Sequence, residues 1–180
     1  MNILRYEIID STNTECVRLF EKQNENKLNL PFCVIAESQS QGRGQFDRKW
    51  FSNDTENLYI SFCFIPKHPI HEFINFSTIL AYQIKKNIHE KLNISIDVKA
   101  PNDLYFNGKK FGGILTESKI INDKIAYAVS GIGININCDM TKFPEELQKI
   151  STSLQEICNQ YIDKTLIEQI VIDSINGLIK

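Results

Sequence analysis

Apolar and polar residues follow one another along the chain with two different spacings. Short apolar runs bounded by turn residues predict β-strands, and apolar residues three and four positions apart predict amphipathic helices. The pattern predicts strands at residues 4–9, 32–37, 58–65, 94–98, 104–106, 111–116 and 126–130, and helices at 14–23, 70–92, 153–160 and 165–179. This mixture predicts an α+β domain in which a mixed β-sheet carries helices on one face.

Turn signals divide these elements. Asn107-Gly108, which lies between two apolar strands, is the strongest short-range signal for a β-hairpin, and residues 122–123 predict a second turn. Residues 138–150 are expected to be loop-like. Because no internal repeat or low-complexity linker interrupts the pattern, we expect a single domain over residues 1–180.

Composition narrows the class of protein. A chain of 180 residues is long enough for a real core, because a chain of this size buries roughly 70% of the surface that its unfolded form exposes. The formal net charge of -2 gives no general attraction for nucleic acid or anionic lipid. Five scattered cysteines without a CxxC motif, no signal peptide and no long apolar run favour a cytoplasmic protein with reduced thiols and no membrane contact.

The most informative loop covers residues 37–50, which read ESQSQGRGQFDRKW, between two predicted strands. Gly42 and Gly44 let the backbone approach a ligand closely, and the guanidinium of Arg43 offers donors suited to a carboxylate or a phosphate. Consecutive loop N–H groups also form concavities that bind anions. The loop therefore predicts a site for a small anion, and the alternative is a mobile, solvated hairpin loop whose charges face water.

Two further stretches carry polar residues at positions where strands meet other elements. Ser11, Thr12 and Asn13 follow the first strand; one of the first two is expected to cap a helix, and three such residues in a row also suit a polar ligand. Residues 99–117 read KAPNDLYFNGKKFGGILTE and place Lys110 just before a glycine pair in a returning strand. A glycine pair inside a strand marks a bulge or the close approach of another group, although a hairpin with exposed lysines is also common.

Together these stretches resemble the catalytic domain of biotin protein ligases. Each motif is weak alone, but they occur in the order of that family, between residues 11 and 137, and residues 151–154 fit its second ligand-covering loop. The matching residues are Ser11-Thr12-Asn13, Gln39 with Gly42-Arg43-Gly44, Arg48 and Trp50, Asn57-Leu58-Tyr59, Pro101-Asn102-Asp103, Lys110 with Gly112-Gly113-Ile114-Leu115, and Gly131 with Gly133-Ile134-Asn135.

The resemblance implies a fold and a reaction. The fold would be that of the biotin/lipoate ligase catalytic domain, which is similar to class II aminoacyl-tRNA synthetases. The reaction would use ATP and Mg²⁺ to convert biotin to biotinyl-5′-AMP, and would then transfer biotin to a lysine of a biotin carboxyl carrier protein. No tightly bound prosthetic group is expected. The protein would act as a monomer or a homodimer.

The resemblance also implies roles for individual residues. Donors and acceptors at the strand-to-helix corner would bind the cyclic urea of biotin, and cations would lie between its carboxylate and the α-phosphate of ATP. The expected biotin-binding residues are Ser11, Thr12, Asn13, Gln39, Gly42, Arg43, Gly44, Gln45, Lys110 and Gly113; the nucleotide-binding residues are Arg48, Trp50, Asn135 and Lys99; the catalytic residues are Arg43, Lys110 and Arg48; and Asp103 would hold Mg²⁺.

The sequence departs from the family pattern at three positions. Gln45 stands where an Arg is frequent, Asp47 where Gly is frequent, and Ala100 where Trp is usual. The first two changes remove positive charge or flexibility from the glycine loop, so retention of the adenylate is expected to be weaker unless Arg48 and Lys49 compensate. We also expect neither an N-terminal helix-turn-helix, and hence no DNA binding, nor a complete C-terminal β-barrel.

Two other functions remain open at this point. A lipoate or octanoate ligase would share the fold and the chemistry of adenylation, and competition between biotin and lipoate would separate the two. A non-catalytic biotin-binding module would result if the departures disabled the glycine loop. We further expect this loop to be mobile without ligand and ordered around biotinyl-AMP.

Overall fold

The structure is a computed structural model and describes residues 1–22, 28–67 and 69–179, with the side chain of Asp47 left out. The predicted end of the first helix, at residue 23, lies outside these residues. Seven strands form one sheet in the spatial order β1-β2-β3-β7-β6-β5-β4. Their bounds are β1 Asn2–Ile9, β2 Phe32–Gln39, β3 Leu58–Phe64, β4 Asp97–Lys99, β5 Asp103–Phe106, β6 Lys109–Ile121 and β7 Lys124–Ile134.

The sheet is mixed, as the sequence predicts. Strands β1 and β2 run parallel, and the other neighbouring pairs are antiparallel. A parallel pair needs a crossover connection, and α1 (Thr12–Glu21) lies in that crossover. Ser11 is the N-cap of α1, with its hydroxyl oxygen 3.5 Å from the N–H of Thr14, so the predicted cap is confirmed.

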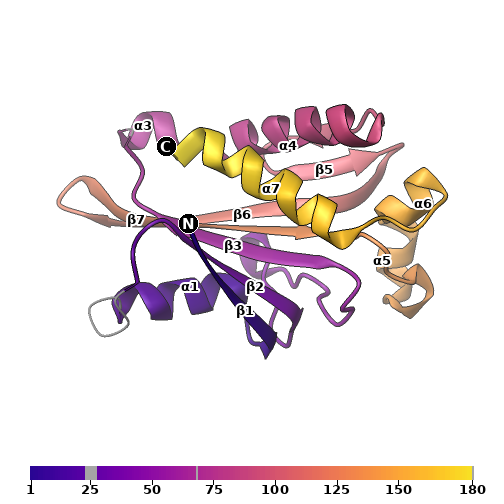
Figure 1. The fold of residues 1–180 in the computed structure, drawn as a ribbon, viewed down its shortest axis with the longest axis horizontal. Helices are drawn as coiled ribbons and strands as arrows, with labels where there is room; N and C mark the ends of the chain where they lie inside the picture. Colours follow the sequence, from indigo (N-terminus) through magenta and orange to yellow (C-terminus); the bar gives the residue numbers. More distant parts are fainter. Residues whose placement is uncertain (23–27, 68, 180) are drawn as a thin grey trace.

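Helices cover both faces of the sheet, although unequally. Two long helices, α4 (Phe76–Leu92) and α7 (Lys164–Ile179), pack on one face and build the larger apolar core. Helix α1 packs on the opposite face over β2, β3 and β7 (Figure 1). The predicted fold class is right, but the expectation of helices on one face holds only for α4 and α7.

Strand β2 shows why both faces are occupied. Phe32 and Val34 point into the core below α1, whereas Cys33 and Ile35 point into the core below α4 and α7. Successive side chains of a strand point to opposite faces, so a continuous apolar run must be covered on both sides. The apolar run at residues 32–36 therefore already carries the signal for a helix on each face.

The predicted turns are confirmed and the strands beside them are longer than expected. Asn107 and Gly108 have φ values of 47° and 79°, as a two-residue hairpin turn requires, and residues 122–123 also have positive φ. Strand β6 extends to Ile121 and β7 begins at Lys124, whereas the pattern predicted strands only to residue 116 and from 126. Ladder hydrogen bonds join backbone groups, so pairing continues where the side chains become polar.

Three other predicted elements differ from the structure. The predicted helix at 70–92 is two helices, α3 (Ile70–Phe73) and α4, and the strand predicted at 94–98 is β4, at Asp97–Lys99. Residues 138–150, predicted as loop-like, contain the short helices η2 (Met140–Lys142) and α5 (Glu145–Ile150). The last predicted helices are α6 (Leu154–Cys158) and α7. Helix α5 has no buried residue, so it lacks the apolar periodicity on which a helix prediction rests.

Candidate functional site

The floor of the site is the part of the sheet that α1 leaves uncovered. Four residues lie side by side across neighbouring strands: Tyr59 on β3, Gly133 on β7, Gly113 on β6 and Asp103 on β5. The two central positions have no side chain, so the side chains of Trp50 and Lys110 can lie directly over the strand backbone between Tyr59 and Asp103. The glycines of β6 and β7 therefore create space on the face opposite the main core.

Neighbouring groups depend on these glycines. A Cβ atom at Gly133 would lie 2.6 Å from the indole nitrogen of Trp50, and one at Gly131 would lie 2.0 Å from Oδ1 of Asn13. Real Cβ atoms do not approach other atoms so closely, so any side chain at either position would displace its neighbour. Glycine is required here because Trp50 and Asn13 pack directly on the strand backbone.

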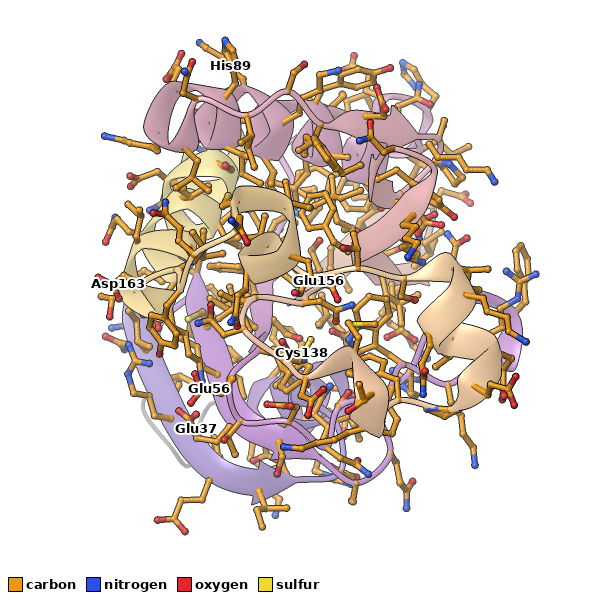
Figure 2. All side chains as sticks on the ribbon, turned by 90° about the vertical axis from the view of Figure 1, so that its right-hand side faces the viewer. Glu37, Glu56, His89, Cys138, Glu156 and Asp163 are labelled. Carbon is orange, nitrogen blue, oxygen red and sulfur yellow. The ribbon has the colours of Figure 1, made fainter. Side chains whose placement is uncertain are left out.

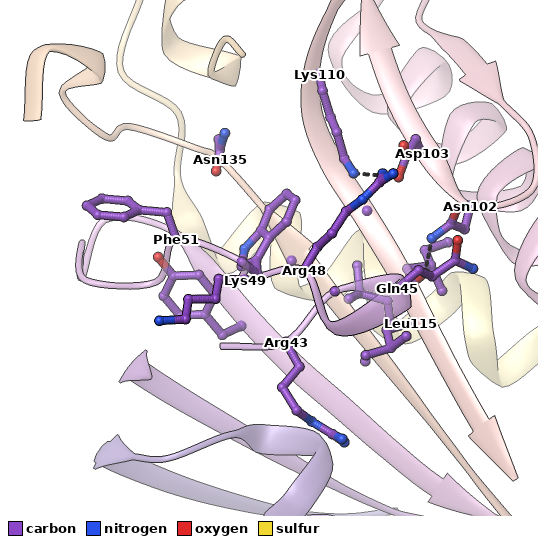
Figure 3. A pocket seen from close by; sticks show the side chains of 18 of the residues that line it. Arg43, Gln45, Arg48, Lys49, Phe51, Asn102, Asp103, Lys110, Leu115 and Asn135 are labelled. Atoms are coloured by element: carbon purple, nitrogen blue, oxygen red, sulfur yellow. Dashed lines mark hydrogen bonds and ion pairs between the residues drawn. The ribbon is translucent and has the colours of Figure 1, made fainter. Parts of the chain in front are cut away.

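A cavity of about 280 Å³ lies above this floor. Its walls are the start of α1, the loop at residues 43–51 and the segment at 143–151, which includes α5 (Figure 3). Figure 2 shows α5 and α6 at the same end of the sheet. The volume is close to the lower end of the range for pockets that take small molecules. The cavity is therefore suited to a small ligand rather than to a polymer.

Buried polar side chains form one wall of the cavity. Gln39 accepts hydrogen bonds from the backbone N–H and the hydroxyl of Thr12, at 2.8 and 3.1 Å, and donates to the hydroxyl of Ser52 at 3.0 Å. The Ser61 hydroxyl lies 2.7 Å from the Thr12 hydroxyl and 2.6 Å from Oδ1 of Asn13. All five side chains are buried. Their mutual hydrogen bonds hold donors and acceptors in fixed positions at the strand-to-helix corner.

Two of the predicted cations lie in ion pairs on different sides of the site. Lys110 Nζ lies 2.6 Å from the carboxylate of Asp103 and 5.2 Å from the centre of the Trp50 ring. Arg43 Nη2 lies 2.6 Å from Oε2 of Glu117, and its guanidinium points away from Lys110 (Figure 3). Lys110 therefore faces the cavity with a carboxylate at hand, while Arg43 ties the glycine loop to β6.

Two buried polar atoms of the described residues have no hydrogen-bond partner: Nε1 of Trp50, a donor, and Oδ1 of Asn135, an acceptor. Both residues line the cavity. The amide nitrogen of Asn135 donates to the carbonyl of Thr152, and the N–H of Thr152 donates to the carbonyl of Lys110. Buried polar groups are almost always paired in folded proteins, so an unpaired donor and acceptor in one cavity indicate a site for a polar ligand.

The glycine loop is compact at its base. The backbone N–H of Trp50 donates to the Gly42 carbonyl at 2.9 Å, and the backbone N–H of Gly44 donates to the Arg48 carbonyl at 2.7 Å. At the tip, Phe46 has a φ of 55°, unusual for an aromatic residue, and its side chain is 85% exposed. The tip therefore makes little contact with the rest of the protein. Mobility of the loop remains a prediction.

Burial raises the pKa of Tyr59, whose side chain lies at the floor of the cavity. The hydroxyl of Tyr59 accepts from Asn57 and donates to the Asp54 carbonyl, and burial raises the pKa of this phenol above its ordinary value. Tyr59 is therefore neutral at physiological pH. At the start of α1, the hydrogen bond from Arg18 lowers the pKa of Asp10, whose carboxylate also accepts from Ser11 N–H.

The structure brings almost all predicted site residues together. Gly42 lies behind the cavity wall, where a Cβ atom would lie 2.3 Å from the Ser52 hydroxyl oxygen, and Lys99 lies apart on β4, exposed, with Nζ 5.3 Å from the ring of Tyr105. The side chain of Asp47 lies outside the described part. Those that line the cavity are Ser11, Thr12, Asn13, Gln39, Arg43, Gly44, Gln45, Arg48, Trp50, Asp103, Lys110, Gly113 and Asn135.

Sequence reasoning missed three residues that hydrogen-bond to side chains lining the cavity: Glu117, Ser61 and Ser52. Two of them carried a signal. Glu117 follows Gly113 and Leu115 at a spacing of two, so it lies on the same face of β6. Ser61 is the only polar side chain apart from Tyr59 in the apolar run LYISFCF. A polar residue at a buried strand position indicates a hydrogen-bonding role.

The described residues contain neither a cluster of metal ligands nor a membrane-spanning helix. Within residues 1–22, 28–67 and 69–179, no three His, Cys, Asp or Glu side chains gather where they would bind a metal ion. In the same part of the chain, no helix has both the length and the apolar character required to cross a bilayer. Among the described residues, Asp103 is the one carboxylate that lines the cavity and could bind a metal ion. It is already paired with Lys110.

The fold and the cavity are those of a domain suited to a small molecule with both polar and anionic groups. The sequence model of the biotin/lipoate A/B protein ligase family matches residues 6–135, so the chain belongs to this family. The chain is 36% identical over 131 residues to the bifunctional ligase/repressor BirA of Bacillus subtilis, a match that covers 73% of this chain and 40% of BirA. It is 34% identical over 129 residues to BirA of Escherichia coli, covering 72% and 39%.

Solved structures agree with this assignment. The biotin protein ligase from Aquifex aeolicus in complex with biotin and ATP has a TM-score of 0.78 and 29% identity, covering 99% of this chain and 70% of that one. An archaeal lipoate protein ligase from Thermoplasma acidophilum has a TM-score of 0.64 at 10% identity, covering 99% and 84%, and shares the fold alone. The predicted biotin/lipoate ligase fold is confirmed. The chain spans about 40% of the length of the two BirA relatives.

Proposed function

We propose that this protein is a biotin protein ligase, which activates biotin with ATP and transfers it to a lysine of a biotin carboxyl carrier protein. The observation that supports this most strongly is the single cavity that contains both the buried polar corner and Lys110. Similarity to a ligase solved with biotin and ATP, over 99% of the chain, supports the same choice of substrates.

The polar corner suits the cyclic urea of biotin. A urea presents one carbonyl acceptor and two N–H donors, and the corner offers hydroxyl groups of Ser11 and Thr12 together with the carbonyl oxygen of Gln39. The apolar side chains of Leu115 and Ile132 line the same cavity and suit the bicyclic ring. The hydrogen bonds among these polar groups already hold them in fixed positions. Binding of the urea would therefore need little reorganisation of the site.

In the first half-reaction an oxygen of the biotin carboxylate attacks the α-phosphorus of ATP. The bond from this phosphorus to the bridging oxygen of the β-phosphate breaks, and pyrophosphate leaves with the electron pair. Negative charge accumulates on the phosphate oxygens in the transition state, where a fixed ammonium group stabilises it most. Lys110 is positioned for this role because Asp103 and the face of Trp50 hold its Nζ over the cavity floor.

In the second half-reaction the neutral amine of a carrier lysine attacks the acyl carbon of biotinyl-5′-AMP. An amide bond forms, the acyl–phosphate bond breaks, AMP leaves, and the amine gives up its proton. The mixed anhydride hydrolyses if water reaches it, so the glycine loop must cover the intermediate while leaving access for the lysine. Arg48 and Lys49, which lie in the loop and line the cavity, would hold the phosphate of the adenylate.

Magnesium fits this site only as a partner of ATP. Mg²⁺ is commonly bound by one or two carboxylates together with substrate phosphates. Asp103 supplies one carboxylate in the cavity, and no second carboxylate joins it among the described residues. We propose that Asp103 would hold the ion together with the triphosphate, and that the ion would offset phosphate charge.

We also propose that the protein acts in the cytoplasm. All five cysteines are free, and four are buried, as a reducing compartment maintains them. Burial raises the pKa of the thiols, to about 12 for Cys33, Cys63 and Cys138, so they remain as unreactive thiols.

Mass spectrometry of a carrier domain incubated with this protein, biotin and ATP tests the proposal. We expect the mass of one biotinyl group on one lysine, together with the release of pyrophosphate. The same reaction with lipoate in place of biotin is the matched comparison. Modification by lipoate alone would identify a lipoate ligase, and binding of biotin without pyrophosphate release would identify a non-catalytic module.

A further inference from the structure

Glu117 joins the glycine loop to the polar corner. Its Oε2 atom accepts a hydrogen bond from Arg43 Nη2 at 2.6 Å and another from Asn13 Nδ2 at 2.8 Å. Arg43 lies in the glycine loop, and Asn13 lies in the first turn of α1. One carboxylate oxygen of β6 therefore contacts both the glycine loop and the first turn of α1.

The contacts continue around the cavity wall. From Asn13 they pass through the hydroxyls of Ser61 and Thr12 to the side chain of Gln39, at distances of 2.6, 2.7 and 3.1 Å. From Gln39 they pass to Ser52, whose hydroxyl donates to the carbonyl of Trp50 at 3.0 Å.

This arrangement closes on the glycine loop. The backbone N–H of Trp50 donates to the carbonyl of Gly42, the residue before Arg43. Both ends of the loop, at Arg43 and at Trp50, are thus attached to one set of hydrogen bonds. Glu117 is the only charged acceptor in that set, and β6 also contributes the carbonyl of Leu115, which accepts from Asn13. Its loss would detach the Arg43 end and leave Asn13 without one of its acceptors.

We propose that Glu117 is a positioning residue of the biotin-activating site, which holds Arg43 and the base of the glycine loop in register with the polar corner. This inference rests on the proposed function. Glu117 does not act on the reacting atoms; it acts through Arg43 and Asn13. A guanidinium has five N–H donors, so Arg43 retains free donors for an anion while Nη2 is held by the carboxylate.

A buried third partner, Asn13, distinguishes this pair from an ordinary surface ion pair. The side chains of Arg43 and Glu117 are 45% and 40% exposed, and exposed pairs contribute little by themselves. Asn13 is only 4% exposed, and its amide nitrogen bonds to the Leu115 carbonyl and to Glu117. Arg5 and Glu168 form a comparable ion pair between β1 and α7 that does not line the cavity, which makes Glu168 a matched control.

The experiment compares Glu117→Ala, Glu117→Gln and Glu168→Gln. We measure biotin-dependent pyrophosphate release and, in the ligand-free proteins, amide hydrogen exchange of residues 42–50. Glu117→Ala should lower kcat/KM for biotin about ten-fold, as expected for the loss of a charge-assisted contact. Glu117→Gln keeps an acceptor for Asn13 and should lose only about three-fold. Exchange in the loop should rise in Glu117→Ala, whereas Glu168→Gln should match the wild type in both measurements.

A second set of variants tests whether Glu117 acts through Arg43. If it does, adding Glu117→Ala to Arg43→Ala should lower kcat/KM by less than about three-fold further, because the two changes remove the same contact. A full ten-fold loss in that background would overturn the role through Arg43. Thermal unfolding of all variants separates a positioning role from a structural one, since only the latter lowers the melting temperature together with activity.

The failure of this inference differs from the failure of the proposed function. A wild-type protein that releases no pyrophosphate with biotin overturns the proposed function. In that case the hydrogen exchange of the loop still tests whether Glu117 holds the loop in place. An active wild type with an equally active Glu117→Ala variant overturns the inference. Unchanged loop exchange in Glu117→Ala overturns it as well, whether or not the wild type is active.

Discussion

The two faces of the sheet are built on opposite principles. The face below α4 and α7 is filled by fully buried apolar side chains from strands β2, β3, β7, β6 and β5. The other face has a small apolar core below α1, and beyond it glycines, buried hydroxyls and ion pairs surround a cavity. Adjacent residues of the same strands serve both faces, so the alternation of side chains separates stability from ligand binding within single strands.

The largest expected effect lies on the cavity face, at Lys110. Lys110→Ala should reduce biotinyl-AMP formation by ~10²-fold or more, the scale of a lost oxyanion donor. Lys109 is exposed on the opposite side of β6 and is the matched control, so Lys109→Ala should remain near wild type. Single-turnover formation of the adenylate measures both variants. Equal rates would remove Lys110 from its assigned role.

The closed face should respond in stability rather than in catalysis. Ile84 on α4 is fully buried, and Ile84→Ala should lower the free energy of unfolding by about 2–4 kcal/mol because it leaves a cavity in the main core. Ile79 lies on the same helix and is 48% exposed, so Ile79→Ala should cost about 0.5 kcal/mol or less. Denaturant unfolding measures both values. Similar losses for the two variants would contradict the division between the faces.

These two positions also show what can be predicted from sequence. Which of Lys109 and Lys110 faces the cavity depends on the register shift between Leu104 and Tyr105. The buried helix face of Ile84 and Ile88, in contrast, can be inferred from their spacing alone. The pairing of Glu117 with Arg43 cannot, because 74 residues separate the partners and their contact depends on the register of β6 against the rest of the sheet. Helix α1 was predicted, but its packing on the face opposite α4 and α7 was not, although the apolar run at residues 32–36 carries that signal.

Arg43 should show an effect intermediate between Lys110 and the exposed control. Arg43→Ala should reduce adenylate formation by about ten-fold or more, since a charge-assisted hydrogen bond contributes roughly 1.5–3 kcal/mol. The guanidinium lies in an ion pair with Glu117 and not beside Lys110, so the loss should appear mainly as a higher KM. Steady-state pyrophosphate release at varied biotin separates KM from kcat. An unchanged rate would contradict the assignment.

The glycine loop should differ from the closed face in its response to ligand. Its tip has few contacts, so we expect rapid proteolysis within residues 42–50 of the ligand-free protein and about ten-fold slower cleavage with biotinyl-AMP, as for a local opening suppressed by a tight ligand. Cleavage at the 107–108 turn, which a short hairpin holds, is the internal comparison. Equal loop cleavage with and without the adenylate would contradict the prediction.

The smallest expected effect concerns the negative charge of Asp10, which pairs with Arg18 at the start of α1 on the cavity face. Arg18 lowers the pKa of Asp10 below its ordinary value, so the native state binds protons less readily there than the unfolded chain. The stabilisation is therefore complete above the unfolded pKa near ~4 and is lost as pH falls through the folded pKa. Asp10→Asn should reduce the free energy of unfolding at pH 7 by at most about 0.5 kcal/mol, because the pair is largely exposed and screened.

Two further measurements isolate this charge effect. The difference between Asp10→Asn and the wild type should shrink to nothing at a pH below the folded pKa of Asp10, where the wild-type carboxyl is protonated. It should also shrink at high salt, since mobile ions screen exposed pairs. The deficit of Ile84→Ala should be the same under both conditions, because burial of apolar surface does not depend on the charge of Asp10. A deficit of Asp10→Asn that persists at low pH would show that the carboxylate acts through the shape of its hydrogen bonds to Ser11 and not through its charge.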